Sequence, residues 1–394
     1  MLASLSRLVR TRSITPLRAF LPMTTAASEN YCTMNSAAQS GILPEGDNTA
    51  FFSTYKMNYE LLSTKEGFAN FTESVKKFPQ VLKESSEVNN MPVTGTISFG
   101  KKLWETLTEN NKELKGTGAE LFDFPGYGKA PATQADFYVH IHSKYNGACY
   151  DCAAMFMGLL MPNLLTVADS VNGFVWRDSR DLTGFIDGTE NPSGQKDRAA
   201  AALNEDQCSF ALVQRFEHNL SKWGKLTRDA QESVIGRTKP DSTQLKPLPM
   251  GSHVAHTDID VDGVNVKMVR QSLPYGSPNG VKGLWFTCYC HYLKGIDETE
   301  KSIFGLRGVE EDHLMSYITP VTGGYYFAPS LTMLSKLYGC LLGERNRVCG
   351  VDNPIVAPHH SFTFSLCLLQ YPFRLPVFGR KPQGVGSCVC WFPA

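Results

Sequence analysis

The stretch Thr183–Pro192, TGFIDGTENP, places a single carboxylate, Asp187, between two glycines and directly after two apolar residues. An ionised carboxylate can act as a general base, and apolar surroundings raise its pKa because they disfavour the charged form. The same letters would also suit an ordinary turn. The segment therefore presents a candidate acid–base group whose strength depends on what surrounds it.

A second candidate is Arg270, in the segment Val264–Ser272, where apolar residues alternate as in a strand. Alternation places Arg270 and Ser272 on the same face as the apolar side chains, so both are predicted to point inward. An inward-facing arginine is uncommon unless it is paired or functional. The sequence leaves both interpretations open, a structural buried ion pair and a functional cation.

Several cysteines have spacings that also occur in zinc sites, namely Cys149/Cys152, Cys288/Cys290 and Cys388/Cys390. A structural zinc site needs four ligands, usually from two such pairs in close register. The first pair lies in an apolar helical run, and the last pair has no partner pair nearby. Buried or incidental thiols are the favoured interpretation.

Two further patterns resemble metal sites. Asp258–Gly263 matches the opening of an EF-hand loop, but the twelfth position, which must supply a carboxylate, is Val269. A hairpin turn at Asp262-Gly263 is therefore favoured. His140 and His142 lie two apart on a predicted strand and share one face. Spacing suggests no further metal ligand, so a surface or half-buried strand face is favoured over a metal site.

The elements that must position these groups belong to a chain of 394 residues, long enough for one large domain or two ordinary ones. Its 38 basic and 38 acidic residues balance, which gives no reason to expect nucleic acid or an anionic membrane as partner. No run of residues is apolar enough to span a bilayer. Eleven scattered cysteines, an odd number, favour reduced thiols in an intracellular compartment.

Residues 1–35 differ from the rest in composition. Arginines at positions 7, 10, 12 and 18, several Ser and Thr, and no acid before Glu29 are typical of a mitochondrial transit peptide. The alternative is a disordered start, with translation beginning at Met23 or Met34 and a cytoplasmic location. Residues 341–394 are rich in Pro, Gly and Cys and lack periodicity, so no fold is predicted for this tail.

Between these segments, residues 36–340 alternate strands and helices through two halves, about 36–170 and 171–340. Apolar spacing predicts helices over 65–83, around Leu103–Leu107, and over 148–161, 220–235, 297–306 and 330–337. Strands are predicted at 93–99, 137–142, 208–216, 264–272 and 284–291. The spacing is not that of regular parallel βαβ units, so we predict an α+β fold with antiparallel sheets covered by helices.

Gly184–Gly188 fits the pattern G-x-x-D-G, and with further blocks in consistent order the chain resembles the dye-decolorizing peroxidases, a haem peroxidase family, and its bacterial-type members in particular. The further blocks are Val234–Lys239, Ser252–Val254, Arg270–Gly276, Gly283–Phe286, Asp312–Leu314 and Thr322–Ser330. The resemblance covers roughly residues 36–340. His256 departs from it, because relatives often carry Arg there, and the tail has no counterpart.

The resemblance implies two ferredoxin-like halves, forming a dimeric α+β barrel-like domain, with one haem b held mainly by the second half. It also implies roles for particular residues. His253 would ligate the iron, with Asp312 accepting the other N–H of its ring. Asp187 and Arg270 would form the distal pair above the iron, with Ser272 as a third polar group. Phe286 would line the distal pocket, and Glu190 would lie near a haem propionate.

The function implied is a haem-dependent peroxidase that reduces hydrogen peroxide and oxidises phenols, dyes or other small organic reductants, with a homo-oligomeric state left open. A haem-handling, iron-releasing protein is the alternative, and a chlorite-dismutase-like relative is disfavoured because it would lack the acid at Asp187. An Asp stays ionised in acid where His would not, so we predict activity that favours mildly acidic pH. Trp223 and Tyr275 are candidates by type for electron relay, with buried packing favoured.

Overall fold

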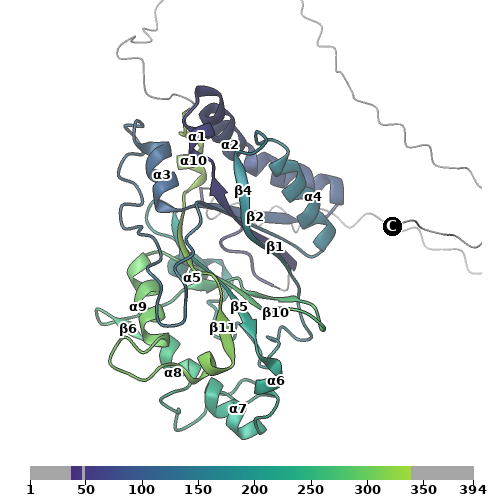
Figure 1. Ribbon diagram of the computed structural model, residues 1–394, viewed down its shortest axis with the longest axis vertical. Coiled ribbons are helices and arrows are strands. Elements are labelled where there is room, and N and C mark those ends of the chain that lie inside the picture. Colours follow the sequence, from purple (N-terminus) through teal and green to yellow (C-terminus); the bar gives the residue numbers. More distant parts are fainter. Residues whose placement is uncertain (1–36, 47–48, 339–394) are drawn as a thin grey trace, which may run out of the picture. The chain divides into compact units, whose positions relative to one another are not determined.

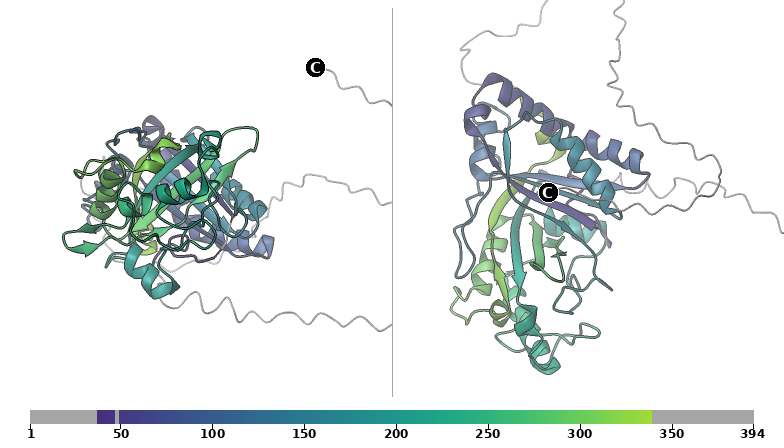
Figure 2. Two further views of the ribbon diagram at one scale, coloured as in Figure 1. Left: turned by 90° about the horizontal axis from the view of Figure 1, so that it is seen from below. Right: turned by 45° about the vertical axis from the view of Figure 1, so that its right-hand side comes forward.

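The computed structural model describes residues 37–46 and 49–338. In the first half the strands lie side by side as β2-β3-β1-β4, and every pairing is antiparallel. Its elements are β1 (Thr49–Met57), α1 (Tyr59–Leu62), α2 (Lys65–Asn89), β2 (Val93–Phe99), α3 (Lys101–Thr108), β3 (Phe137–Ser143), α4 (Asn146–Met157) and β4 (Leu165–Gly173). Helices α2 and α4 lie together over one face of these strands (Figures 1 and 2).

The second half repeats this plan around β5 and β10, which pair along most of their length. Its elements are α5 (Gly194–Ala202), β5 (Ser209–His218), α6 (Leu220–Trp223), α7 (Arg228–Ile235), α8 (His253–Thr257), β6 (Asp260–Val261), β7 (Val264–Asn265), β8 (Val269–Arg270), β9 (Leu273–Gly276), β10 (Lys282–Cys290), α9 (Leu293–Ile303), the 3₁₀ helix η2 (His313–Ser316), β11 (Ile318–Pro320), β12 (Gly324–Ala328) and α10 (Leu331–Ser335). Helix α9 packs on β5 and β10 and contacts α8.

The two sets of strands join at both sides. Gly173 of β4 pairs with Tyr275 of β9, and Phe99 of β2 pairs with Phe327 of β12. With the β5–β10 pairing, the sheet closes on itself. The predicted α+β fold with antiparallel sheets and covering helices is confirmed, and the closure holds residues of the two halves at fixed positions relative to one another.

Helix α2 shows how the sequence builds the first core. Thr64 caps the helix, its hydroxyl accepting from the Gly67 N–H at 3.0 Å, and apolar residues three or four apart then face the sheet. The helix ends where Asn90 adopts a left-handed backbone with φ 47°. The predicted helix over 65–83 is therefore too short, because after Leu82 the helix no longer presents large apolar residues to the core.

Phe137, on β3, is fully buried at the centre of this core. Its ring lies 5.4 Å from that of Phe71 and 5.3 Å from that of Phe99, between centroids. We expect Phe137→Ala to lower the free energy of unfolding by about 3–5 kcal/mol, because it removes buried area and leaves a cavity. Urea denaturation measures this effect. Phe122→Ala, whose side chain is 37% exposed, is the matched control, and an equal loss in both variants would contradict the prediction.

Two elements of the second half that the sequence predicts as continuous are each divided into two in the structure. The predicted helix 220–235 is two helices, α6 and α7, because Gly224 ends the first and Thr227 caps the second. The predicted strand 264–272 is likewise broken, since β7 pairs with β6 in a separate hairpin while β8 pairs with β10. The predicted turn at Asp262-Gly263 is confirmed, with φ of 54° and 80°.

The prediction that His140 and His142 lie on a surface or half-buried strand face is wrong. Both are buried, because α2 and α4 cover one face of β3 and the second half covers the other, where the His140 ring nitrogen Nδ1 meets the Tyr289 hydroxyl at 2.9 Å. Cys149 and Cys152 are confirmed as buried free thiols, and burial raises their pKa values to about 11 and about 12.

Among the described residues, no three His, Cys, Asp or Glu side chains gather as they would around a metal ion. Within the same part of the chain, no helix is long and apolar enough to cross a membrane. The predicted leader 1–35, the pair Cys388/Cys390 and the tail 341–394 lie outside the described residues.

Candidate active site

Two glycines and an arginine fix the loop that carries Asp187. Gly184 and Gly188 have φ of 92° and 86°, a backbone conformation that L side chains rarely adopt, and a Cβ on Gly184 would lie 2.6 Å from Lys239 Cε. Arg180 spans the loop, donating to the carbonyl oxygens of Gly184 at 2.8 Å and Lys239 at 2.6 Å. Arg180 therefore ties the start of the loop, before Asp187, to the segment that carries Lys239.

Asp187 is half-buried and borders every cavity of the site. Burial raises the pKa of Asp187 above its usual value, the positive charge of Arg270 lowers it, and the nearby Asp181 raises it again. Burial is the largest of these effects. Asp187 is thus a stronger proton acceptor than an exposed aspartate once it is ionised, and Arg270 keeps the ionised form accessible.

Arg270 is held by its backbone. Its N–H donates to Asn191 Oδ1 at 2.8 Å, and the Asn191 amide donates back to the Arg270 carbonyl at 2.8 Å. The described residues make no hydrogen bond to the guanidinium, which borders two cavities together with Asp187. The sequence placed Arg270 on an inward face correctly, but the reason is its pairing opposite Cys288 of β10 and not a continuous strand.

His253 is the first residue of α8, which Ser252 caps. Its Nδ1 lies 2.6 Å from Asp312 Oδ2, and Asp312 is 1% exposed. The other oxygen of Asp312 accepts the Leu314 N–H at 2.8 Å, which orients the carboxylate. The pair therefore uses one ring nitrogen of His253, and Nε2 is the nitrogen that remains for a ligand.

Two adjoining cavities, of about 220 and 140 Å³, separate the Asp187 loop from His253. We call them together the slot. Their shared walls are Ile186, Asp187, Ile235, His253, Phe286, Glu300 and Ile303. All residues around the slot come from the second half of the chain, and most of the shared walls are apolar, so the slot suits a large ligand with apolar surfaces.

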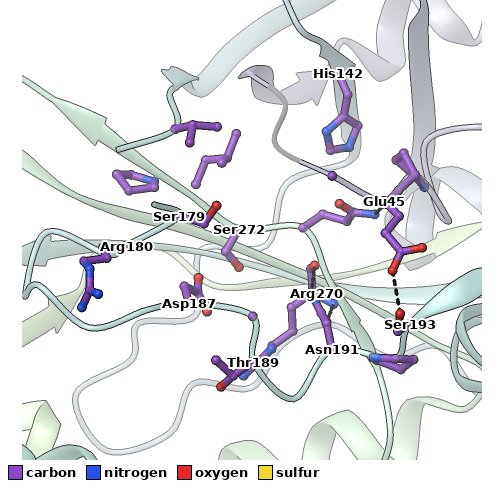
Figure 3. Close-up of a pocket in the computed structure, with 18 of the residues that line it drawn as sticks. Glu45, His142, Ser179, Arg180, Asp187, Thr189, Asn191, Ser193, Arg270 and Ser272 are labelled. Carbon is purple, nitrogen blue, oxygen red and sulfur yellow. Dashed lines mark hydrogen bonds between the residues drawn. The ribbon is translucent and has the colours of Figure 1, made fainter. Parts of the chain in front are cut away.

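A third cavity, of about 400 Å³, lies on the other side of Asp187 and Arg270. We call it the outer pocket (Figure 3). Ser272 borders it, with its Oγ 3.3 Å from the Thr287 N–H, and the first half contributes Glu45 and His142. Ser272 borders the outer pocket but neither cavity of the slot, unlike Asp187 and Arg270.

The remaining predicted site residues occupy different surroundings. Phe286, on β10, lies in the shared wall of the slot. Glu190 is exposed at one end of the slot, where it forms an ion pair with Arg237. His256 is buried, with its Nδ1 2.9 Å from the Ser302 carbonyl oxygen, and it does not border the slot.

Trp223 and Tyr275 are both buried, as the packing interpretation predicted. The Trp223 indole N–H donates to the Thr183 carbonyl at 2.8 Å, so the residue supports the base of the Asp187 loop. The Tyr275 hydroxyl accepts from Arg215 at 2.9 Å. Neither side chain offers an exposed ring.

Sequence reasoning missed Glu300, which borders both cavities of the slot and is 3% exposed. Burial raises its pKa to about 8, although a hydrogen bond from Gln214 lowers it, so burial favours the protonated form. The signal was present, because Ile296, Glu300 and Ile303 are spaced four and three apart and share one face of α9.

Comparison with known families matches two models along the chain. Residues 39–175 match the N-terminal domain of Dyp-type peroxidases, and residues 178–333 match the C-terminal domain. The chain belongs to the Dyp-type peroxidase family. It is therefore an oxidoreductase that acts on peroxide.

Individual relatives agree with this family. A dye-decolorizing peroxidase of Mycobacterium tuberculosis is 34% identical over 254 residues, which cover 60% of this chain and 73% of that protein. A solved dye-decolorizing protein from Vibrio cholerae superposes with a TM-score of 0.70 and 35% identity, covering 76% of this chain and all of that one. A variant of DypB from Rhodococcus jostii RHA1 in complex with heme gives a TM-score of 0.70 at 26% identity, covering 76% of this chain and 99% of that one.

A protein described differently also matches. Deferrochelatase from Escherichia coli is 25% identical over 226 residues, which cover 46% of this chain and 52% of that protein. The match extends over about half of the length of that relative.

Proposed function

We propose that this Dyp-type peroxidase uses haem b, bound in the slot, to reduce hydrogen peroxide to water while it oxidises phenols, dyes or other small organic reductants. The observation that carries the proposal is the arrangement of the slot, with the His253–Asp312 pair on one side and Asp187 beside Arg270 on the other. In this view the two halves are ferredoxin-like units of one barrel-like domain, and the second half holds the haem.

The residues of the slot fit a haem. An imidazole whose Nδ1 faces a buried carboxylate is held in one orientation, with Nε2 available to iron and with increased electron donation. Apolar residues such as Ile235, Phe286 and Ile303 line the slot, as a porphyrin face requires. Arg237 and Glu190 lie at a more polar end, where the propionates would be accommodated.

The haem iron supplies the redox chemistry, and the chain's own residues handle protons and charge. Asp187 accepts a proton from one oxygen of peroxide and returns it to the other, which leaves as water. Arg270, fixed by Asn191, stabilises the negative charge that develops on the leaving oxygen. Ser272, on the outer-pocket side, offers a further hydroxyl to peroxide that enters there.

Asp312→Asn tests the orientation of the proximal histidine. An amide cannot accept the His253 N–H with the strength of a carboxylate, so we expect haem affinity or peroxide turnover to fall by about 10–100-fold. The measurements are haem titration by absorbance and steady-state turnover of a phenol. Asp197→Asn, on the exposed face of α5, is the control. Unchanged affinity and turnover in Asp312→Asn would contradict the assigned role.

The function itself is tested by loading the purified chain with haem and adding hydrogen peroxide with a phenolic donor. We expect a Soret band of bound haem, its change on addition of peroxide, and sustained oxidation of the donor with one peroxide consumed for every two one-electron oxidations. Haem that binds without any consumption of peroxide would refute the proposal.

The match to deferrochelatase supports a second candidate, release of iron from haem. The same slot would hold the haem in both cases, so the products decide between them. Intact iron-free porphyrin, detected by fluorescence and mass spectrometry after incubation with haem and a reductant, would favour iron release. Unchanged haem after many turnovers of peroxide favours the peroxidase.

We also propose that residues 1–35 direct the protein to mitochondria, as their composition predicts. A fluorescent protein fused behind residues 1–35 would enter mitochondria in this case. A diffuse cytoplasmic signal would support the alternative start at Met23 or Met34.

A further inference from the structure

One end of the outer pocket carries a buried cation, Arg198 of α5, which borders the pocket and is 3% exposed. Its guanidinium is held in place by three backbone carbonyl oxygens. Nε donates to Leu43 at 3.1 Å, Nη1 to Pro192 at 3.0 Å and Nη2 to Pro44 at 2.7 Å. A guanidinium has five N–H groups, so two of those of Arg198 remain for another acceptor.

No carboxylate of the described residues forms an ion pair with Arg198, since its hydrogen bonds all go to backbone carbonyl groups. Glu45, which borders the same pocket, accepts instead from the Ser193 hydroxyl and the Gly194 N–H, each at 3.1 Å (Figure 3). Burial lowers the pKa of the Arg198 guanidinium, and the charge of Glu45 raises it. A buried cation without a paired anion costs free energy, which a negatively charged ligand would offset.

His142 of β3 lies at the same end of the outer pocket. It is 3% exposed, and its ring is directed into the pocket (Figure 3). Its Nε2 is buried without a hydrogen-bond partner in the part of the chain that the structure describes. Burial and the charge of Arg198 lower the pKa of His142 to about 3, so the two side chains are close enough to interact. An unpartnered nitrogen and an unpaired cation therefore face the same space.

The rest of the outer pocket suits a ring. Apolar side chains contribute to its wall, namely Val175, Trp176, Leu273 and Pro274. Its volume of about 400 Å³ is enough for a small organic molecule. Asp187 lies in the wall away from Arg198, and its negative charge disfavours an anion beside it. A ligand with one acid group and one aromatic ring would therefore place the acid at the end formed by Arg198 and His142.

We propose that the outer pocket binds small aromatic carboxylates through Arg198 and His142, and that phenols of this class are reductants of the enzyme. The substrate role rests on the proposed peroxidase function. The two remaining N–H groups of Arg198 give charge-assisted hydrogen bonds to the carboxylate, which shares a proton with Nε2 of His142. Each phenol loses one electron and its hydroxyl proton, and two phenols reduce one hydrogen peroxide to two waters.

The test compares 4-hydroxybenzoate with 4-hydroxybenzamide, which has nearly the same shape but no charge. Both are titrated into the haem-loaded full chain by calorimetry at neutral pH, without peroxide. We expect the carboxylate to bind about 10–100-fold more tightly, the usual effect of hydrogen bonds to a charged group. The Soret band should stay unchanged, because the probe does not reach the iron. Equal affinities, or binding that shifts the Soret band, would overturn the proposal.

Two variants assign the binding to this end of the pocket. Arg198→Gln removes the cation, and His142→Leu removes the imidazole and leaves Arg198 in place. Each should lower the affinity for 4-hydroxybenzoate at least about 10-fold and leave that for the amide unchanged. Arg228→Gln, whose side chain is 60% exposed and lies outside the pocket, is the control and should bind as the wild type does. Thermal melting identifies variants that fold, and full affinity in a folded His142→Leu would exclude the site.

Steady-state turnover separates this inference from the function on which it rests. With peroxide added, 4-hydroxybenzoate should have a lower KM than 4-hydroxybenzamide, and Arg198→Gln should remove the difference. Consumption of peroxide with equal KM values for the two donors would overturn only the assigned substrate class. A loaded chain that consumes no peroxide with either donor would refute the peroxidase function, whatever the calorimetry shows.

Discussion

Substitution of His253 by alanine is expected to reduce peroxide turnover to the level of free haem and to weaken haem binding. His253 borders both cavities of the slot, and the buried Asp312 lies 2.6 Å from its Nδ1, whereas His218 borders one cavity and lies 3.6 Å from Asp181. Under the proposed function the iron would lose its protein ligand in this variant, and Asp312 would remain as a buried carboxylate without its partner. We therefore expect lower thermal stability as well.

The measurements are haem titration followed by the Soret band, phenol oxidation and thermal melting. His313→Ala is the matched control, because His313 is the neighbour of Asp312 and its side chain is 51% exposed. Added imidazole should restore part of the Soret shift in His253→Ala by entering the space left by the side chain. Normal turnover by His253→Ala would exclude His253 as the iron ligand.

Asp187→Asn is expected to lower the rate of reaction with peroxide by about 10²–10⁴-fold, the usual contribution of a positioned general base. An amide of nearly the same shape cannot accept the proton, so binding of haem should be unchanged. Stopped-flow measurement of the Soret change on mixing with peroxide gives this rate directly. Asp197→Asn again serves as the control for loss of an aspartate elsewhere.

The pH profile gives a second measure of the same residue. Burial raises the pKa of Asp187, and the base form exists only above that pKa, so the rate falls as pH decreases through it. The acid limb of the wild type should therefore lie above the usual range of aspartate, with highest activity on the mildly acidic side. Asp187→Asn should lack this limb. An optimum well above pH 7, or an unchanged limb in the variant, would contradict the assignment.

Part of this molecule could be predicted from its sequence, and the reasons are local. Helix α2 shows its apolar face at helical spacing, and the turn at Asp262-Gly263 carries its own residue signature. Strands β1 and β4 were missed. β1 is buried along most of its length and so does not alternate, while β4 pairs with β1 as a largely exposed strand with polar residues. Neither segment alone predicts the pairing of β1 with β4, because the pairing depends on the closed sheet.

The site also contains residues that the sequence predicted and one that it did not. Asp187, His253 and Arg270 could be predicted because of their motifs and their order. Asp187 and Arg270 are 83 positions apart in the sequence, so it is the fold that brings them together. Glu300 stayed hidden, because an acid within a helix usually faces water. Only the packing of α9 against β5 and β10 turns it toward the slot.

The walls of the two cavity systems come from different parts of the chain, and this has an evolutionary consequence. Every residue around the slot belongs to the second half, whereas Glu45 and His142 bring the first half to the outer pocket. Substitutions in the first half can therefore alter the outer pocket beside Asp187 while the residues of the slot stay unchanged. Related proteins can therefore differ in the molecules that fit the outer pocket and still keep the same residues around the slot.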